Sequence, residues 1–298
     1  MKKKMISCDL SQIEPRVLAW CAGDQVMLNN LAAGQSPYEA HARATMGWTG
    51  TGKELKANKP LYGLAKVRIL GLGYGCGWRK FIKVAKKLAN LDITRNDPEW
   101  VQDTTREGEP LFNKDGTAKM VSGYGLNSKQ IVREFRKQNP LIAARETGLW
   151  ARLDQAFKSS IGGDFELVLP SGRTMLYREV REGWTMVENE ETGLMERRRA
   201  VTAEGFRDGR VVRLKLYGGL LAENLVQATA RDVFAEHLLE LEDTPGVTIL
   251  FTCHDEAVLE VDENISANDI QKIMSKTPSW LEGCPIAAEA KEIACYCK

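Results

Sequence analysis

The 298-residue chain lacks several features that would define its class at once. It contains no run of about 18 uncharged apolar residues, so we expect no helix that spans a membrane. Behind the basic start, only Met5-Ile6 is apolar, which is too short for an export signal. There is no internal repeat, and a composition of 43% hydrophobic and 27% charged residues excludes collagen, coiled coil and general disorder.

Cysteine and histidine are also too sparse to suggest a structural metal site. The seven cysteines are odd in number and form no C-x-x-C pair, and the three histidines do not stand at zinc-ligand spacing. This pattern is typical of reduced thiols, so we expect a cytoplasmic protein.

Charge of both signs is abundant but unevenly distributed. The chain has 41 basic and 40 acidic residues, for a net charge of +1. Residues 51–90 carry ten basic residues against one acidic residue, and residues 236–298 carry thirteen acidic residues against four basic ones. The first segment can attract phosphates and the second can hold cations. Two solvated faces with no such role are an equal alternative.

Hydrophobic patterning predicts a mixture of helices and strands. Polar, charged residues between 92 and 125 predict a surface loop or insertion. The predicted helices are 16–21, 38–46, one from Pro60 through Lys66, 78–91, 128–157 with a break at Pro140, and 220–241. The predicted strands are 5–10, 165–169, 174–177, 184–188, 211–216, 247–252 and 257–261.

Acidic residues lie at the ends of two predicted elements. Asp9 ends the first strand, and Asp255-Glu256 occupies the tip of the hairpin formed by strands 247–252 and 257–261. Carboxylates on rigid strand ends suit Mg²⁺, which prefers one or two carboxylates together with substrate phosphates. Two such ions about 3.5–4 Å apart can activate a hydroxyl and stabilise a leaving pyrophosphate. Either acidic cluster taken alone is more often merely solvated.

The acidic residues belong to two of three short sequence motifs. The first is Asp9-Leu-Ser-Gln-Ile-Glu14-Pro-Arg16, the second is Lys66 with Tyr74-Gly75 eight residues later, and the third is His254-Asp255-Glu256 after an apolar strand. They resemble motifs A, B and C of the family A DNA polymerases, the group of bacterial DNA polymerase I and many phage replicases. Gln227 and Leu169-Pro-Ser-Gly-Arg173 fit the same family, and the resemblance runs from residue 5 to about 262.

The resemblance implies a catalytic and metal-binding role for the acids. Asp9 and Asp255 would bridge two Mg²⁺ ions, with Mn²⁺ as an alternative, and the Leu10 backbone carbonyl would be a further ligand. Glu256 would support them. A two-metal nuclease would use the same acids but would give Lys66 and Tyr74 no role.

The resemblance also implies contacts with nucleotide and DNA. Lys66 would contact the triphosphate, and Glu14 with Tyr74 would exclude a ribose 2′-hydroxyl, so the substrates would be dNTPs. The other positions expected near the nucleotide are Leu10, Ser11, Gln12, Tyr38 and Leu70. The positions expected at the primer terminus or the minor groove are Asn224, Gln227, Arg231 and His254. Three of these share one face of a predicted helix, although a polar stripe is usually just the wet side of a helix.

Some positions depart from the family pattern. Tyr62 stands where the family usually has a phosphate-binding arginine, for which Lys59 or Arg68 are the candidate substitutes. Tyr38 replaces a histidine of the bacterial enzymes, and Leu70 replaces an aromatic residue that packs against the nucleotide sugar.

The resemblance predicts an α+β fold. A polymerase palm with a small antiparallel sheet would comprise residues 1–30 and 160–298, and helical fingers would comprise 31–159. Because motif A begins at Asp9, we expect thumb and 3′→5′ exonuclease domains to be absent. Either a second polypeptide supplies them, or the chain works alone with a weak grip on DNA. The expected function is template-directed synthesis on primer-template DNA by one subunit of a split phage replicative polymerase. The alternative is a non-catalytic DNA-binding or scaffold subunit.

Overall fold

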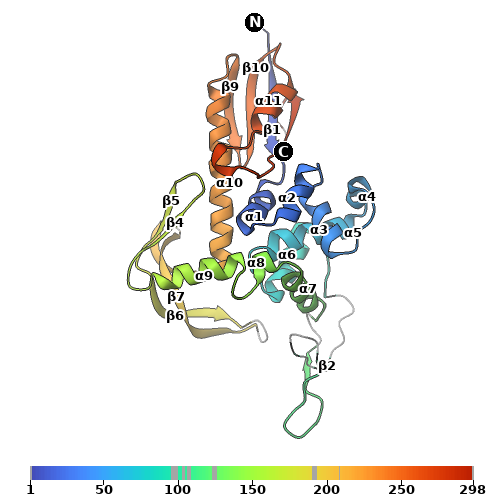
Figure 1. Ribbon diagram of the computed structural model, residues 1–298, viewed down its shortest axis with the longest axis vertical. Coiled ribbons are helices and arrows are strands. Elements are labelled where there is room, and N and C mark those ends of the chain that lie inside the picture. The colour runs from blue at the N-terminus through green and yellow to red at the C-terminus, as the bar shows by residue number, and fades with distance from the viewer. Residues whose placement is uncertain are drawn as a thin grey trace. The chain divides into compact units, whose positions relative to one another are not determined.

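The computed structural model describes residues 2–94, 100–102, 105, 109–122, 126–189, 193–207 and 209–296 (Figure 1). Among these residues no helix is both long and apolar enough to cross a membrane. The helices are α1 (Ile13–Ala22), α2 (Gln25–Ala32), α3 (Pro37–Thr45), α4 (Gly52–Ala57), α5 (Lys59–Val67), the π-helical turn η1 (Arg68–Leu72), α6 (Trp78–Ala89), α7 (Leu126–Gln138), α8 (Pro140–Ala143), α9 (Leu149–Ser159), α10 (Gly218–Glu242), α11 (Ala267–Met274) and the 3₁₀ turn η2 (Ser279–Leu281). The strands are β1 (Lys3–Leu10), β2 (Trp100–Gln102), β3 (Met120–Ser122), β4 (Phe165–Val168), β5 (Thr174–Tyr177), β6 (Arg181–Glu188), β7 (Met195–Arg207), β8 (Arg210–Lys215), β9 (Val247–Cys253), β10 (Glu256–Asp262) and β11 (Ala288–Ile293).

The chain divides into two compact units. Unit 1 comprises Met1–Ala40, Asp164–Arg178 and Ala222–Lys298, and unit 2 comprises His41–Gly163 and Glu179–Leu221. Residues 179–221, which belong to the predicted palm segment, therefore lie in unit 2. The identification of these units with a palm and fingers stays a prediction.

Unit 1 is built on a four-stranded antiparallel sheet in the order β11-β1-β10-β9 (Figure 1). Ile6, Ser7 and Cys8 follow one another in β1 and are all buried. Since successive strand residues face opposite sides of a sheet, both faces are covered at this point. α11 packs against β1 and β11. The apolar residues of β10 are buried as well, so the hairpin β9–β10 is anchored in the core of the unit.

Unit 2 has a helical core formed by α5, η1, α6 and α7. Phe81 and Phe135 are fully buried in it, and Val67 and Leu72 complete the contact from α5 and η1. The same unit contains the antiparallel sheet β6-β7-β8 and the small pair β2-β3. That pair lies within the predicted insertion at 92–125, of which residues 95–99, 103–104, 106–108 and 123–125 lie outside the described residues.

The longest strand of unit 2, β7, was not predicted from the sequence. Its first half contains Arg197, Arg198 and Arg199 in succession, and Gly205 follows in the second half. Neither feature is typical of a strand, because strands favour β-branched and aromatic residues. Pairing with β6 on one side and β8 on the other supplies the stabilisation that local propensity lacks.

A buried histidine makes unit 2 sensitive to acid. Burial, reinforced by Arg68, lowers the pKa of His41 to about 3, against about 6.5 in an unfolded chain. Protonation therefore favours unfolding, so the contribution of His41 to stability is complete above pH 6.5 and is lost as the pH falls towards 3. Between pH 6.5 and 3 the free energy of unfolding should decrease as the pH falls, and we expect this decrease to be smaller in His41→Asn. The difference in slope should be up to about 1.4 kcal/mol per pH unit. Denaturant titrations from pH 7 to 4 measure the free energy of unfolding of both proteins. Equal slopes of this free energy against pH would contradict the prediction.

Candidate functional site

The acids of the first and third motifs meet at one end of the unit 1 sheet. In the antiparallel pairing of β1 with β10, Asp9 lies directly opposite Glu256. The Leu10 backbone N–H donates a hydrogen bond of 3.2 Å to the carbonyl of Asp255. Asp9 is exposed and Asp255 is half-buried. Strand pairing thus brings together two acidic residues, Asp9 and Asp255, that lie far apart in the sequence.

The geometry of Asp255 is set by a tight turn. Cys253 pairs with Glu256, which leaves His254 and Asp255 as the two turn residues. His254 has φ = 59°, and a positive φ at the first turn residue matches the hairpin turns that follow strand twist. His254 is exposed at the tip. The turn therefore presents Asp255 beside the end of β1.

Glu256 occupies a different environment from the other two acids. Its side chain is buried, and it accepts hydrogen bonds from the Ser7 hydroxyl and from the Tyr296 hydroxyl at 3.1 Å. Burial, together with the charges of Asp9 and Glu256, raises the pKa of the neighbouring Cys8 thiol to about 12. A buried carboxylate with two hydroxyl donors is a satisfied structural group. The geometry is that of a supporting residue.

The loop after β1 is held by a buried arginine. Arg16 donates from Nε to the Ser11 carbonyl at 2.7 Å and from Nη1 to the Pro285 carbonyl at 2.9 Å. The Ser11 N–H donates to the Ala287 carbonyl, and Gln12 adopts the left-handed conformation at φ = 54°. Burial lowers the pKa of Arg16. Sequence reasoning assigned Arg16 no role, and its partners, two backbone carbonyls, give no signal in the sequence.

A second set of polar side chains joins α1 to α10 near Asp255. The Gln227 side chain hydrogen-bonds the Glu14 carboxylate. Burial raises the pKa of Glu14, and the charges of Glu223 and Asp255 raise it further, while the Gln227 bond opposes both. Glu14, Glu223 and Asp255 therefore concentrate negative charge in one place, which favours a bound cation. The sequence motifs gave no indication of Glu223.

The other predicted DNA contacts on α10 have neighbours within unit 1. Asn224 donates to the Tyr177 hydroxyl of β5 at 2.9 Å. Arg231 is exposed and lies over the Phe234 ring, 5.4 Å from its centroid. These contacts orient the side chains but leave their use in DNA binding as a prediction.

The segment Leu169–Arg173 is bound to α10 by an ion pair and hydrogen bonds. Arg173 forms an ion pair of 2.8 Å with Asp232, and the Ser171 hydroxyl donates to Asp232 at 2.5 Å. Arg173 also donates to the Ala228 carbonyl at 3.2 Å. Asp232 was not singled out in the sequence, yet it fixes the turn between β4 and β5 to α10.

The residues predicted to contact the nucleotide are spread over both units. Tyr38 is buried in unit 1, whereas Lys66, Leu70 and Tyr74 belong to unit 2. Lys66 is half-buried in the last turn of α5, and Leu70 is half-buried in η1. Tyr74 is buried beyond that turn. π-Helical turns often occur at functional sites, and the motif did not reveal this one.

Two residues considered as replacements for the arginine at position 62 differ in exposure. Arg68 is 4% exposed and donates to the Gln138 side chain at 2.8 Å, and burial lowers its pKa. Lys59 is exposed at the start of α5. In this structure Arg68 is a core residue, and its guanidinium is not presented to a phosphate.

The donor set at the end of β1 fits a magnesium ion. No cluster of three or more acidic, histidine or cysteine side chains suited to a metal is found among the described residues. Asp9 and Asp255 with the Leu10 carbonyl supply hard oxygen donors, and Mg²⁺ usually completes its octahedron with water and substrate phosphates. These three residues are therefore the candidates for holding it.

The chain is similar to a curated phage protein. No family model matches the chain. A curated protein of Bacillus phage SP02, named DNA polymerase, is 30% identical over 286 residues, which cover 94% of this chain and 39% of that protein. The chain thus spans about two fifths of the length of this relative. The similarity shows a polymerase-like relationship, and membership of family A stays a prediction.

The charge cluster around Glu14 is testable by titration. Gln227→Leu removes the amide donor, so we expect the pKa of Glu14 to rise further. Glu223→Gln removes a nearby negative charge, so we expect the pKa of Glu14 to fall. Side-chain ¹³C NMR titration of the two variants and the unaltered protein measures both shifts. Shifts of the opposite sign would contradict the arrangement.

Proposed function

We propose that the chain carries the catalytic part of a DNA polymerase of the family A type. It would add dNTPs to a primer 3′-hydroxyl, directed by a template. The observation that carries this proposal is the pairing of β1 with β10, which puts Asp9 beside the turn that holds Asp255. The similarity of nearly the whole chain to a phage protein named DNA polymerase supports the reaction class.

Two divalent ions, Mg²⁺ or Mn²⁺, are proposed to bind at Asp9, Asp255 and the Leu10 carbonyl. Ions bound in this way activate the attacking hydroxyl and stabilise the charge on the leaving pyrophosphate. Catalysis of nucleotidyl transfer then depends mainly on positioning and electrostatic stabilisation. The protein supplies the positioning through strand pairing and through the bonds that hold the loop after β1.

The surrounding residues have supporting parts in this proposal. Buried Glu256 fixes the start of β10, and Arg16 fixes Ser11 and Gln12 next to Leu10. Glu14, held by Gln227, would exclude a ribose 2′-hydroxyl. On unit 2, Lys66 would neutralise triphosphate charge, and Tyr74 and Leu70 would contact the base and sugar. Asn224, Gln227, Arg231 and His254 would contact the primer-template.

Primer extension tests the assignment of the two carboxylates. We expect the purified chain to extend a primed template with Mg²⁺ and dNTPs at low salt. Asp9→Asn and Asp255→Asn should each slow extension roughly 100- to 1000-fold, because each removes a charge that stabilises the transition state. Glu260→Gln is the matched control, since Glu260 lies further along β10 and pairs with Lys3 at 3.4 Å. It should leave the rate unchanged.

A second arm of this experiment separates the alternatives. If the chain alone gives no product, extension is repeated with a candidate second polypeptide that supplies thumb and exonuclease functions. Extension restored by that polypeptide, and lost again in Asp255→Asn, supports a split polymerase. DNA binding without extension in both arms would overturn the catalytic assignment in favour of the scaffold subunit.

The role of Glu14 predicts a change in sugar selectivity. Glu14→Ala removes the side chain proposed to crowd the 2′ position. We therefore expect the ratio of kcat/KM for a ribonucleotide over the matching deoxynucleotide to rise at least about tenfold. Gln227→Leu breaks the hydrogen bond between Gln227 and the Glu14 carboxylate but leaves the Glu14 side chain in place. The kcat/KM ratio of this variant should therefore stay near that of the unaltered protein. Equal ratios in both variants would contradict steric exclusion by Glu14.

A further inference from the structure

The segment that follows β11 contacts the turn that carries Asp255. Its residue Tyr296 is half-buried and belongs to unit 1, as do β1, β9 and β10. The Tyr296 ring packs edge-on against Phe251 of β9, with the ring centroids 5.0 Å apart. Its hydroxyl donates to Oε2 of Glu256 at 3.1 Å and also hydrogen-bonds the Cys253 side chain. None of the three sequence motifs includes Tyr296.

Cys253 and Glu256 are the two residues that close this turn. They are paired across the hairpin, and two residues stand between them, of which Asp255 is the second. On the other side of β10, Glu256 is paired with Asp9 of β1. Residues paired across antiparallel strands share a face of the sheet, so Cys253, Glu256 and Asp9 form one row. Tyr296 thus contacts two members of a row whose third member is a candidate metal ligand.

The aromatic contact directs the Tyr296 hydroxyl towards this row. Phe251 precedes Cys253 by two residues in β9, and the strand pairing is regular between them. Alternation therefore puts both side chains on the same face of the sheet. An edge-to-face pair is a favoured arrangement of two rings. With its ring held at Phe251, Tyr296 presents its hydroxyl at the end of the hairpin.

The Glu256 carboxylate is bonded through both of its oxygens. The Ser7 hydroxyl donates to Oε1 and the Tyr296 hydroxyl donates to Oε2. Glu256 is 8% exposed, and burial of a carboxylate is costly unless its oxygens are bonded. Without the Tyr296 hydroxyl, Oε2 loses a donor and the side chain gains by turning towards water. Because Glu256 directly follows Asp255, that rotation would disturb the turn.

We propose that Tyr296 is a positioning residue for the candidate site. Its hydroxyl holds Cys253 and Glu256, and through them it holds the turn that presents Asp255. A residue that merely attached the segment after β11 would need no hydroxyl, since a phenylalanine ring would pack against Phe251 equally well. The importance of this position for catalysis rests on the proposed function, whereas the positioning itself rests on the contacts of Tyr296.

Amide hydrogen exchange measures the positioning without metal, nucleotide or DNA. Tyr296→Phe removes the hydroxyl and keeps the ring. Cys295→Ser is the control, because it changes an exposed neighbour in the same segment. The reporter is the Leu10 amide, which donates to the Asp255 carbonyl at 3.2 Å. The reference is the amide of Val258, a buried residue within β10.

Tyr296→Phe should speed exchange of the Leu10 amide roughly two- to tenfold, the range expected for one lost hydrogen bond. Exchange at Val258 should stay unchanged, because the effect is confined to the turn. Cys295→Ser should leave both rates unchanged. Equal acceleration at Leu10 and Val258 would indicate general destabilisation and would overturn the proposal. An unchanged rate at Leu10 would overturn it as well.

Primer extension then tests whether the effect passes through Glu256. Tyr296→Phe should lower kcat about three- to tenfold with an unchanged KM for the dNTP, because it shifts Asp255 and removes no proposed nucleotide contact. In a Glu256→Ala background the same substitution should change kcat by less than about twofold, since residues that act through one another are not additive. Fully additive losses, or a rise in KM alone, would contradict this route.

The outcome is separable from that of the proposed function. If the unaltered chain extends no primer under any condition, the catalytic assignment fails. The exchange rates of the Leu10 and Val258 amides would still decide whether Tyr296 positions the turn.

Discussion

The antiparallel pairing of β1 with β10 is the constraint on which the candidate site depends. It places Asp9 opposite Glu256 and commits the Leu10 N–H to the Asp255 carbonyl. Register in a sheet is exact, since a slip of one residue turns every side chain to the other face. Here a slip in either direction would bury Asp9, because its neighbours Cys8 and Leu10 both occupy buried positions. The hydrophobic core of unit 1 therefore enforces the positions of the two carboxylates.

Hydrogen bonds at the end of the sheet stabilise charged side chains whose burial would otherwise be unfavourable. A buried charge is costly unless it is bonded, and Arg16 and Glu256 are both bonded at short range. Glu14 has a raised pKa because it is half-buried near two other carboxylates, and Gln227 offsets only part of that cost. The repulsion left in this cluster is a reason for a cation to bind. Glu14 and Glu223 thus add negative charge near Asp255, which favours a cation at this end of the sheet.

The sequence predicted the parts of this arrangement that depend on local pattern. Apolar and β-branched runs predicted β1 and the hairpin that carries Asp255, and the helical pattern predicted the helix that carries Gln227, whereas the predicted helix 16–21 began after Glu14. The sequence could not predict β7, because three successive arginines are not typical of a strand. Pairing with neighbouring strands stabilises β7 instead. Nor could it show that Arg68 is buried, since that depends on Gln138, 70 residues away. Partners distant in sequence leave no local pattern.

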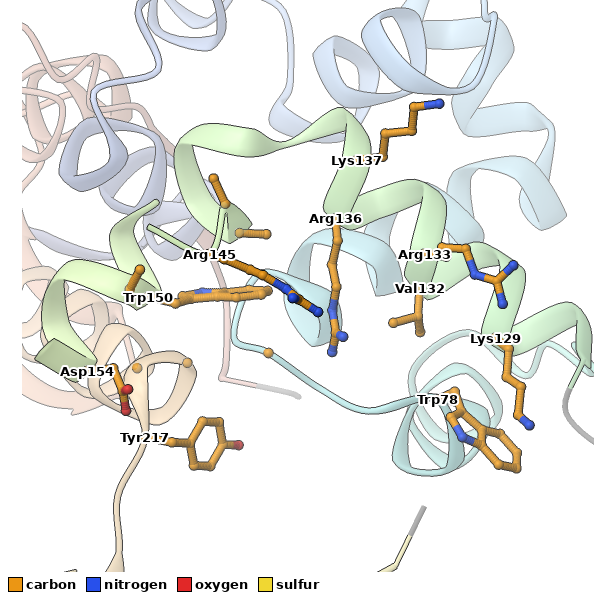
Figure 2. Close-up of a pocket in the computed structure, with 16 residues that line it drawn as sticks. Trp78, Lys129, Val132, Arg133, Arg136, Lys137, Arg145, Trp150, Asp154 and Tyr217 are labelled. Atoms are coloured by element: carbon orange, nitrogen blue, oxygen red, sulfur yellow. The ribbon is translucent and has the colours of Figure 1, made fainter. Parts of the chain in front are cut away.

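The same limit explains why a groove in unit 2, lined by basic and aromatic side chains, had no sequence signature (Figure 2). Its cations lie on α7 and at position 145, and its rings come from positions 78, 150 and 217. The strongest local excess of basic residues, at 51–90, contributes only Gly75 and Trp78 to its lining. Local charge density therefore does not locate the surface where cations and rings converge. Packing creates that surface, because Gly218 approaches the Trp150 backbone so closely that a Cβ there would lie 1.9 Å from the Trp150 carbonyl oxygen. Gly218 is thus required where the start of α10 packs against α9.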